Sequence, residues 1–139
     1  MSGYLLDTNV VSETMRSVPD ARVVTFLAEH DDLWLSSIVV HELEYGVRRL
    51  ARGRRRSGLE ADLLRLTTEY EDRILPLDRV GAEWAARLRV LAQRSGHPLD
   101  LGDALIAGTA KAHDLTVATR NIADFQRVGV DLVNPWEAW

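Results

Sequence analysis

The sequence predicts an α/β fold in which a mainly parallel sheet of about five strands lies between two layers of helices. Short apolar runs, typical of buried strands, alternate with longer segments whose apolar residues recur at helical spacing. Acidic or small polar residues follow several of these runs directly. No internal repeat and no domain linker is found in the 139 residues, so a single domain over residues 1–139 is expected.

Each predicted element follows from a local pattern. The predicted strands are residues 4–6, 33–35, 74–77, 115–118 and 131–133. The predicted helices are residues 10–16 and segments that begin near residues 20, 37, 59, 80, 100 and 121. Pro76 favours an edge position for the third strand, because proline cannot donate to a sheet hydrogen bond. Ser57 and Gly58 are expected to separate an arginine-rich stretch from the fourth helix. Trp136 is expected in the core, and Trp139 at an interface.

Composition excludes several classes of protein. The chain has no cysteine, which excludes disulfides and thiolate metal sites. No apolar run approaches the roughly 20 residues needed to span a bilayer. The first residues lack the basic region of a signal peptide, so a cytoplasmic protein is expected. The net charge is −4, yet six arginines lie between residues 48 and 56.

Four acids are predicted to meet at one edge of the sheet. Asp7 ends the first strand, and ligands of open α/β sheets bind beyond the carboxyl ends of the strands. Glu42 lies about one turn into the helix after the second strand, and helical side chains lean toward the N-terminus. Asp103 and Asp124 lie in the first turns of their helices. Clustered carboxylates repel one another, and Mg²⁺ or Mn²⁺, which prefer oxygen ligands, would relieve that repulsion.

Each acid also has an ordinary structural interpretation. Asp7 could cap the first helix, and Asp100 could cap its own helix with Asp103 three residues later. Asn121 and Asp124 have the same spacing. Glu42 could be a solvated helix residue that pairs with Arg48 or Arg49. Capping explains most of these acids when each is considered alone, and a metal site explains them as a set.

The ordered set of motifs resembles PIN-domain ribonuclease toxins of the VapC type. The similar segments are Leu5-Leu6-Asp7-Thr8-Asn9, the region from Ser36 through Glu42 to Gly46, Asp103-Ala104-Leu105-Ile106-Ala107, and Thr119-Arg120-Asn121 through Asp124-Phe125. The closing segment, Gly129 to Trp136, resembles the FitB-like branch. The resemblance covers nearly the whole chain and implies a three-layer α/β/α PIN-like fold.

The resemblance also implies a site and partners. It makes Asp7, Glu42, Asp103 and Asp124 the acidic quartet, with Asp7, Asp103 and Glu42 as metal ligands. The supporting polar residues would be Thr8, Asn9, Ser36, Thr119 and Asn121. Many PIN domains have an acid where Asn121 stands, which leaves Asp124 as the fourth carboxylate. The implied partners are a small DNA-binding antitoxin, through which alone the chain would meet DNA, and a second copy of the chain.

The predicted function is that of a type II toxin, a Mg²⁺-dependent endoribonuclease that its antitoxin inhibits. The metal would activate a water for attack on the phosphodiester, and Glu42 or Asp124 would orient that water. Arg54, Arg55 and Arg56 could contact RNA phosphates, or could instead complement the dipole at a helix C-terminus. One alternative is a catalytically silent PIN module that serves the antitoxin in DNA-bound autoregulation. Another is a phosphohydrolase of a different α/β family, against which Asn9 argues, because such families have an acid there.

Overall fold

The computed structural model describes residues 3–137, so Trp139 lies outside the described residues. The strands are β1 (Tyr4–Leu6), β2 (Leu33–Ser36), β3 (Ile74–Leu75), β4 (Thr116–Ala118) and β5 (Leu132–Val133). The α-helices are α1 (Thr8–Thr14), α2 (Ala21–Glu29), α3 (Ser37–Arg48), α4 (Arg54–Glu69), α5 (Arg79–Arg94), α6 (Leu101–His113) and α7 (Ile122–Phe125). Two short 3₁₀ helices are η1 (Glu71–Arg73) and η2 (Gln126–Val128).

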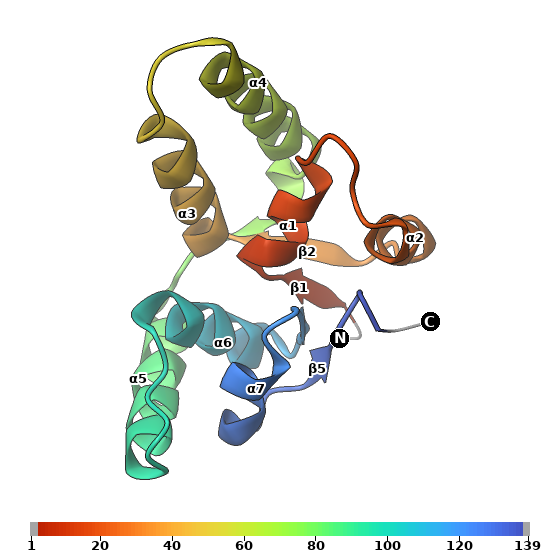
Figure 1. The fold of residues 1–139 in the computed structure, drawn as a ribbon. Helices are drawn as coiled ribbons and strands as arrows, with labels where there is room; N and C mark the ends of the chain where they lie inside the picture. The colour runs from red at the N-terminus through yellow and green to blue at the C-terminus, as the bar shows by residue number, and fades with distance from the viewer. Residues whose placement is uncertain (1–2, 138–139) are drawn as a thin grey trace.

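The strands form one five-stranded sheet in the order β3-β2-β1-β4-β5, and every neighbouring pair is parallel. Leu5 lies in the central strand and pairs with Trp34 of β2 on one side and Val117 of β4 on the other. Right-handed crossovers therefore place α1 to α4 on one face and α5 to α7 on the other. Figure 1 shows α1, α3 and α4 on one side of the strands and α5 to α7 on the other. The predicted parallel α/β sheet is confirmed.

The core has many of the residues that the patterns predicted, although Val80 and Leu91 of the fifth helix are exposed. Val39, Leu43 and Val47 of α3 are buried, as are Leu5 and Leu6 of β1. A parallel strand covered on both faces is expected to be apolar throughout, and β1 shows this pattern. Trp136 is buried after β5, as predicted. Among residues 3–137, no helix is long and apolar enough to cross a membrane.

Several predicted boundaries are wrong. The third strand ends at Leu75 rather than at residue 77. The first helix begins at Thr8 rather than residue 10, because Asp7 at the strand end is itself the N-cap. The expected break at Ser57 and Gly58 is absent, since α4 runs from Arg54 through both residues. The chain breaks instead between α3 and α4, before Gly53. The arginines at positions 54 to 56 thus begin a helix, where they cannot complement a C-terminal dipole.

Candidate metal site at the carboxyl edge of the sheet

Asp7 lies at the point where the strand order reverses. Chain connections run from β1 toward β2 and β3, then return past β1 to β4 and β5. Open α/β sheets form their ligand crevice at such a reversal, between the carboxyl ends of the two strands. The strands that meet here, β1 and β4, are followed directly by Asp7 and Thr119.

The Asp7 carboxylate is buried and accepts three hydrogen bonds. One oxygen, Oδ1, accepts the backbone N–H of Thr8 at 2.8 Å, which caps α1. The other, Oδ2, accepts the Thr119 hydroxyl at 2.6 Å and the Asn9 side-chain amide at 3.2 Å. Burial raises the pKa of Asp7, and the bonds from Thr119, Thr8 and Asn9 oppose that rise. The predicted capping role is confirmed, and it coexists with a place at the site.

Thr119 and Asn9 join the two strand ends. Asn9 donates to Thr119 Oγ1 at 3.3 Å, and its Oδ1 accepts the backbone N–H of Arg120 at 3.2 Å. Thr119 Oγ1 also accepts the backbone N–H of Asn121 at 2.9 Å. This network fixes the turn after β4 to the turn after β1. The exposed Asn121 therefore contributes its backbone, and its side chain forms no cap to α7.

Glu42 reaches the same edge from α3. Its Oε1 accepts the Thr8 hydroxyl at 2.8 Å, a bond between residues 34 positions apart. Arg48 pairs with Glu44 at 2.8 Å, so the pairing of Arg48 with Glu42 that the sequence allowed is wrong. Ser36 is buried and caps α3 by accepting the backbone N–H of Val39 at 3.2 Å. Ser36 thus fixes the start of the helix that carries Glu42.

Asp103 is the acid of the site whose pKa is shifted most. It lies in the first turn of α6 and its pKa is raised to about 7, first by burial and then by Asp7, Asp100, Asp124 and Glu42. Four carboxylates from four separate elements therefore act on one carboxyl group. Asp124 is exposed in the first turn of α7 and acts on both Asp103 and Asp7 through its charge. Asp100 occupies the N-cap position of α6, but its side chain makes no capping hydrogen bond.

The acids suit a hard cation that keeps much of its water. Within residues 3–137, no three acid or imidazole side chains lie close enough to enclose an ion among them. Mg²⁺ often binds through only one or two carboxylates and retains several waters, so the set fits that mode rather than a closed cage. The donor chemistry agrees, because the neighbouring acids add to the effect of burial in raising the pKa of Asp103, and a divalent cation would offset that repulsion.

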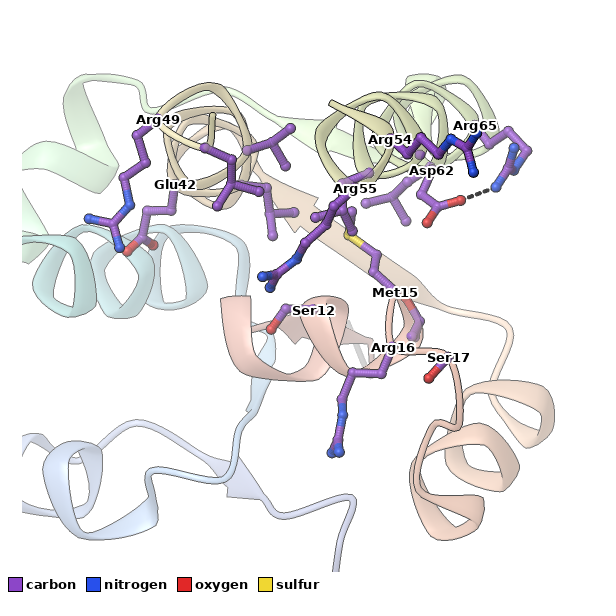
Figure 2. Close-up of a pocket in the computed structure, with 18 of the residues that line it drawn as sticks. Ser12, Met15, Arg16, Ser17, Glu42, Arg49, Arg54, Arg55, Asp62 and Arg65 are labelled. Atoms are coloured by element: carbon purple, nitrogen blue, oxygen red, sulfur yellow. Dashed lines mark hydrogen bonds and ion pairs between the residues drawn. The ribbon is translucent and has the colours of Figure 1, made fainter. Parts of the chain in front are cut away.

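A groove of about 1160 Å³ adjoins the site, between the end of α1 and the hairpin of α3 and α4 (Figure 2). Figure 2 shows Arg55 extending from α4 into the space between α1 and α3, on the side where Glu42 lies. Arg16, Arg49, Arg54 and Arg65 also line this groove. The sequence analysis did not predict this groove. Arg54 and Arg65 are eleven residues apart, which is three helical turns, so they share a face of α4. The expected break at Ser57 placed Arg54 outside this helix.

Comparisons with known proteins agree with this geometry. The family model described as the PIN domain matches residues 4–131. Toxin FitB of Neisseria gonorrhoeae is 41% identical over 138 residues, which cover 95% of this chain and 97% of that protein. VapC ribonuclease Y4jK of Sinorhizobium fredii is 37% identical over 96% of this chain and 97% of its own length. The structure of FitAB bound to an IR36 DNA fragment superimposes with a TM-score of 0.89 at 38% identity, covering 96% of this chain and 95% of that one.

Proposed function

Because this chain belongs to the PIN domain family, we propose that it is a metal-dependent endoribonuclease and the toxin of a type II toxin–antitoxin system. The observation that carries this proposal is Asp103 at the start of α6, whose pKa is raised to about 7 first by burial and then by the charges of Asp7, Asp100, Asp124 and Glu42. The names of two relatives, Toxin FitB and VapC ribonuclease Y4jK, agree with it.

The four acids would have two roles, binding the cation and orienting the attacking water. Asp7 and Asp103, with Glu42, would hold Mg²⁺ or Mn²⁺, one or two of these acids directly and the rest through waters that the cation retains. The bound cation would lower the pKa of a water and stabilise the negative charge that develops on the phosphate. Glu42 and Asp124 would orient the attacking water as hydrogen-bond acceptors. Thr119 and Asn9 would hold Oδ2 of Asp7 in one orientation, and Thr8 would do the same for Oε1 of Glu42.

We propose that Arg54 and Arg55 contact the phosphates of the RNA. Both lie in the first turn of α4 and line the groove beside Glu42. Their charges are unfavourable for the helix itself, because the N-terminal end of a helix dipole is positive. Arg56 is more enclosed: it pairs with Glu60 at 3.3 Å and donates to the carbonyl oxygen of Leu50 at 3.4 Å. Its role would be to fix this turn while its neighbours contact the RNA.

The proposal extends to partners. A small DNA-binding antitoxin would inhibit the chain and carry it to DNA, in keeping with the FitAB relative bound to a DNA fragment. A second copy of the chain would complete the assembly. Exposed apolar residues on α5, Val80, Val90 and Leu91, offer surface for such contacts. We place the chain in the cytoplasm, where RNA substrate and antitoxin are made.

A cleavage assay tests the proposed activity. Antitoxin-free protein should cut structured RNA with Mg²⁺ present and not with EDTA, and Asp7→Asn or Asp103→Asn should abolish cleavage. Asp72→Asn is the matched control, because Asp72 is exposed before β3, at the opposite edge of the sheet. Equal cleavage by Asp7→Asn and wild type would refute the assignment. Inactivity of the wild type on every RNA, together with operator binding by its antitoxin complex, would favour the silent-module alternative.

The salt dependence of RNA binding tests the arginines. Replacing Arg54 and Arg55 by Gln should reduce the slope of log K against log [salt] by about 1.4, since each phosphate contact to a single strand contributes about 0.7. Arg89→Gln on the far helix α5 should leave the slope unchanged, because Arg89 is exposed outside the groove. An unchanged slope in the double variant would refute the contact.

A further inference from the structure

Gly102 lies in a helix, at a position whose backbone conformation does not require glycine. It is the second residue of α6, and its φ is not positive, so other residues could adopt its conformation. Glycine within a helix lowers stability relative to alanine. The reason for glycine here must therefore be space rather than backbone geometry.

The space beside Gly102 is filled by one carboxylate. A Cβ built on Gly102 would lie 3.3 Å from Oε2, 3.5 Å from Cδ and 3.6 Å from Oε1 of Glu42. The nearest of these distances is shorter than nine in ten real Cβ contacts, so the carboxylate would have to shift by a few tenths of an ångström. Gly108, in the same helix, serves a different purpose, since its Cβ would collide with the backbone of α5 at Gly81 and Ala85. Of the glycines among residues 3–137, Gly102 is the one that faces an acid of the site.

Glu42 is therefore held from two sides. Thr8 donates its hydroxyl to Oε1 from the start of α1, and the first turn of α6 lies against the other side of the carboxylate. The first N–H groups of a helix have no partner within the helix, and the Asp100 side chain does not cap this one. The first turn of α6 at Gly102 lies directly against the Glu42 carboxylate.

We propose that Gly102 is a positioning residue, which admits the Glu42 carboxylate against the first turn of α6 and so sets its separation from Asp103. The two acids belong to different helices, and Asp103 follows Gly102 directly. A side chain at position 102 would push Glu42 away from Asp103 and weaken the cation site they share. This inference depends on the proposed function, because it assumes that Glu42 and Asp103 hold a divalent cation together.

Mg²⁺ binding to the RNA-free protein tests the inference by isothermal titration calorimetry. Gly102→Val, whose branched side chain cannot avoid Glu42, should weaken Mg²⁺ binding by about tenfold, the size usual for residues that orient metal ligands. Gly102→Ala should weaken it by less and should raise the melting temperature, since alanine favours the helix. Gly58→Ala in α4 is the control for helix propensity. Gly58 is exposed with nothing within 4 Å of its Cβ, so the melting temperature should rise with Mg²⁺ affinity unchanged.

A double-mutant cycle separates positioning from a general structural effect. Once Glu42→Ala removes the carboxylate, Gly102→Val should have no further effect on Mg²⁺ affinity. An equal loss in both backgrounds would overturn the inference, as would unchanged affinity in Gly102→Ala and Gly102→Val. If Gly102→Val does not fold, the same comparison is made with Gly102→Ala: its Mg²⁺ affinity is measured with Glu42 present and with Glu42→Ala. Absence of Mg²⁺ binding by the wild type would instead overturn the proposed function, and this inference with it.

Discussion

Replacing Asp103 by asparagine should stabilise the metal-free protein while abolishing its activity. The pKa of Asp103 is raised from 3.8 to about 7 by burial and by four neighbouring acids. The unfolded chain therefore loses this proton more readily than the folded one. The contribution of Asp103 to folding stability is greatest below about pH 4 and falls as the pH rises toward 7, since the folded state binds more protons at this group in that window. Asparagine has nearly the same shape and never acquires the charge.

The size of the effect follows from the pKa shift. A rise from 3.8 to about 7 corresponds to about 4 kcal/mol for a fully buried group, at about 1.4 kcal/mol per pKa unit. Asp103 is only partly buried, so solvent screening reduces this to about 2 kcal/mol. For a chain of this length the melting temperature of Asp103→Asn should exceed that of the wild type by roughly 6 to 8 °C above pH 7. The difference should vanish near pH 4.

Thermal unfolding in EDTA between pH 4 and pH 8 measures this difference. Asp72→Asn is the control, because it removes an exposed acid from the opposite edge of the sheet. Saturating Mg²⁺ should reverse the order of stability, since wild type gains about 2.7 kcal/mol at 100 times Kd and the variant cannot bind. A variant that is less stable than wild type at pH 8 in EDTA, or a difference that does not change with pH, would refute the electrostatic account of the site.

Substitutions at three further residues probe other contacts. Thr119→Val should lower the rate of cleavage and Thr119→Ser should preserve it, because the hydroxyl donates to Asp7 at 2.6 Å; equal cleavage rates in the two variants would count against that role. Trp136→Phe should leave the free energy of unfolding in urea within about 1 kcal/mol or raise it, because the buried indole N–H has no hydrogen-bond partner among the described residues. A loss of 3 kcal/mol or more, an order expected only for truncation to alanine, would contradict this. Glu13→Ala should lower that free energy by about 1 to 3 kcal/mol, because buried Glu13 accepts the backbone N–H of Asp20 at 2.8 Å; no loss would contradict it.

Much of the fold could be predicted from local patterns. Apolar strands followed by capped helices predicted the parallel sheet, and Pro76 correctly predicted that the third strand lies at an edge. The boundaries that failed have local causes. Asp7 both follows the strand and caps the helix, so it is the one residue between β1 and α1. Ser57 and Gly58 are poor helix formers, yet α4 continues through them and buries Leu63 against the core.

The candidate site was predictable in its members and not in its contacts. The position of each acid relative to a strand end predicted that Asp7, Glu42, Asp103 and Asp124 converge; after burial, the other three, with Asp100, raise the pKa of Asp103, and their role as a metal site stays a prediction. The hydrogen bonds of Thr8 and Thr119 join residues 34 and 112 positions away, and spacing along the chain carries no information about such pairs. The position of Gly102 against Glu42 depends on how α3 packs on α6, which likewise appears only in three dimensions.

The bond between Asp7 and Thr119 also determines when the site can form during synthesis. Asp7 is among the first residues made, but its Oδ2 partner is separated from it by 112 positions, and β1 has its neighbour β4 only after residue 118. A ribosome adds about 5 to 20 residues each second, so for several seconds the growing chain holds Asp7 and Glu42 without the second half of the crevice. The parallel topology therefore delays nuclease activity until the chain is almost complete. A fragment that ends before β4 should be harmless to the cell that makes it.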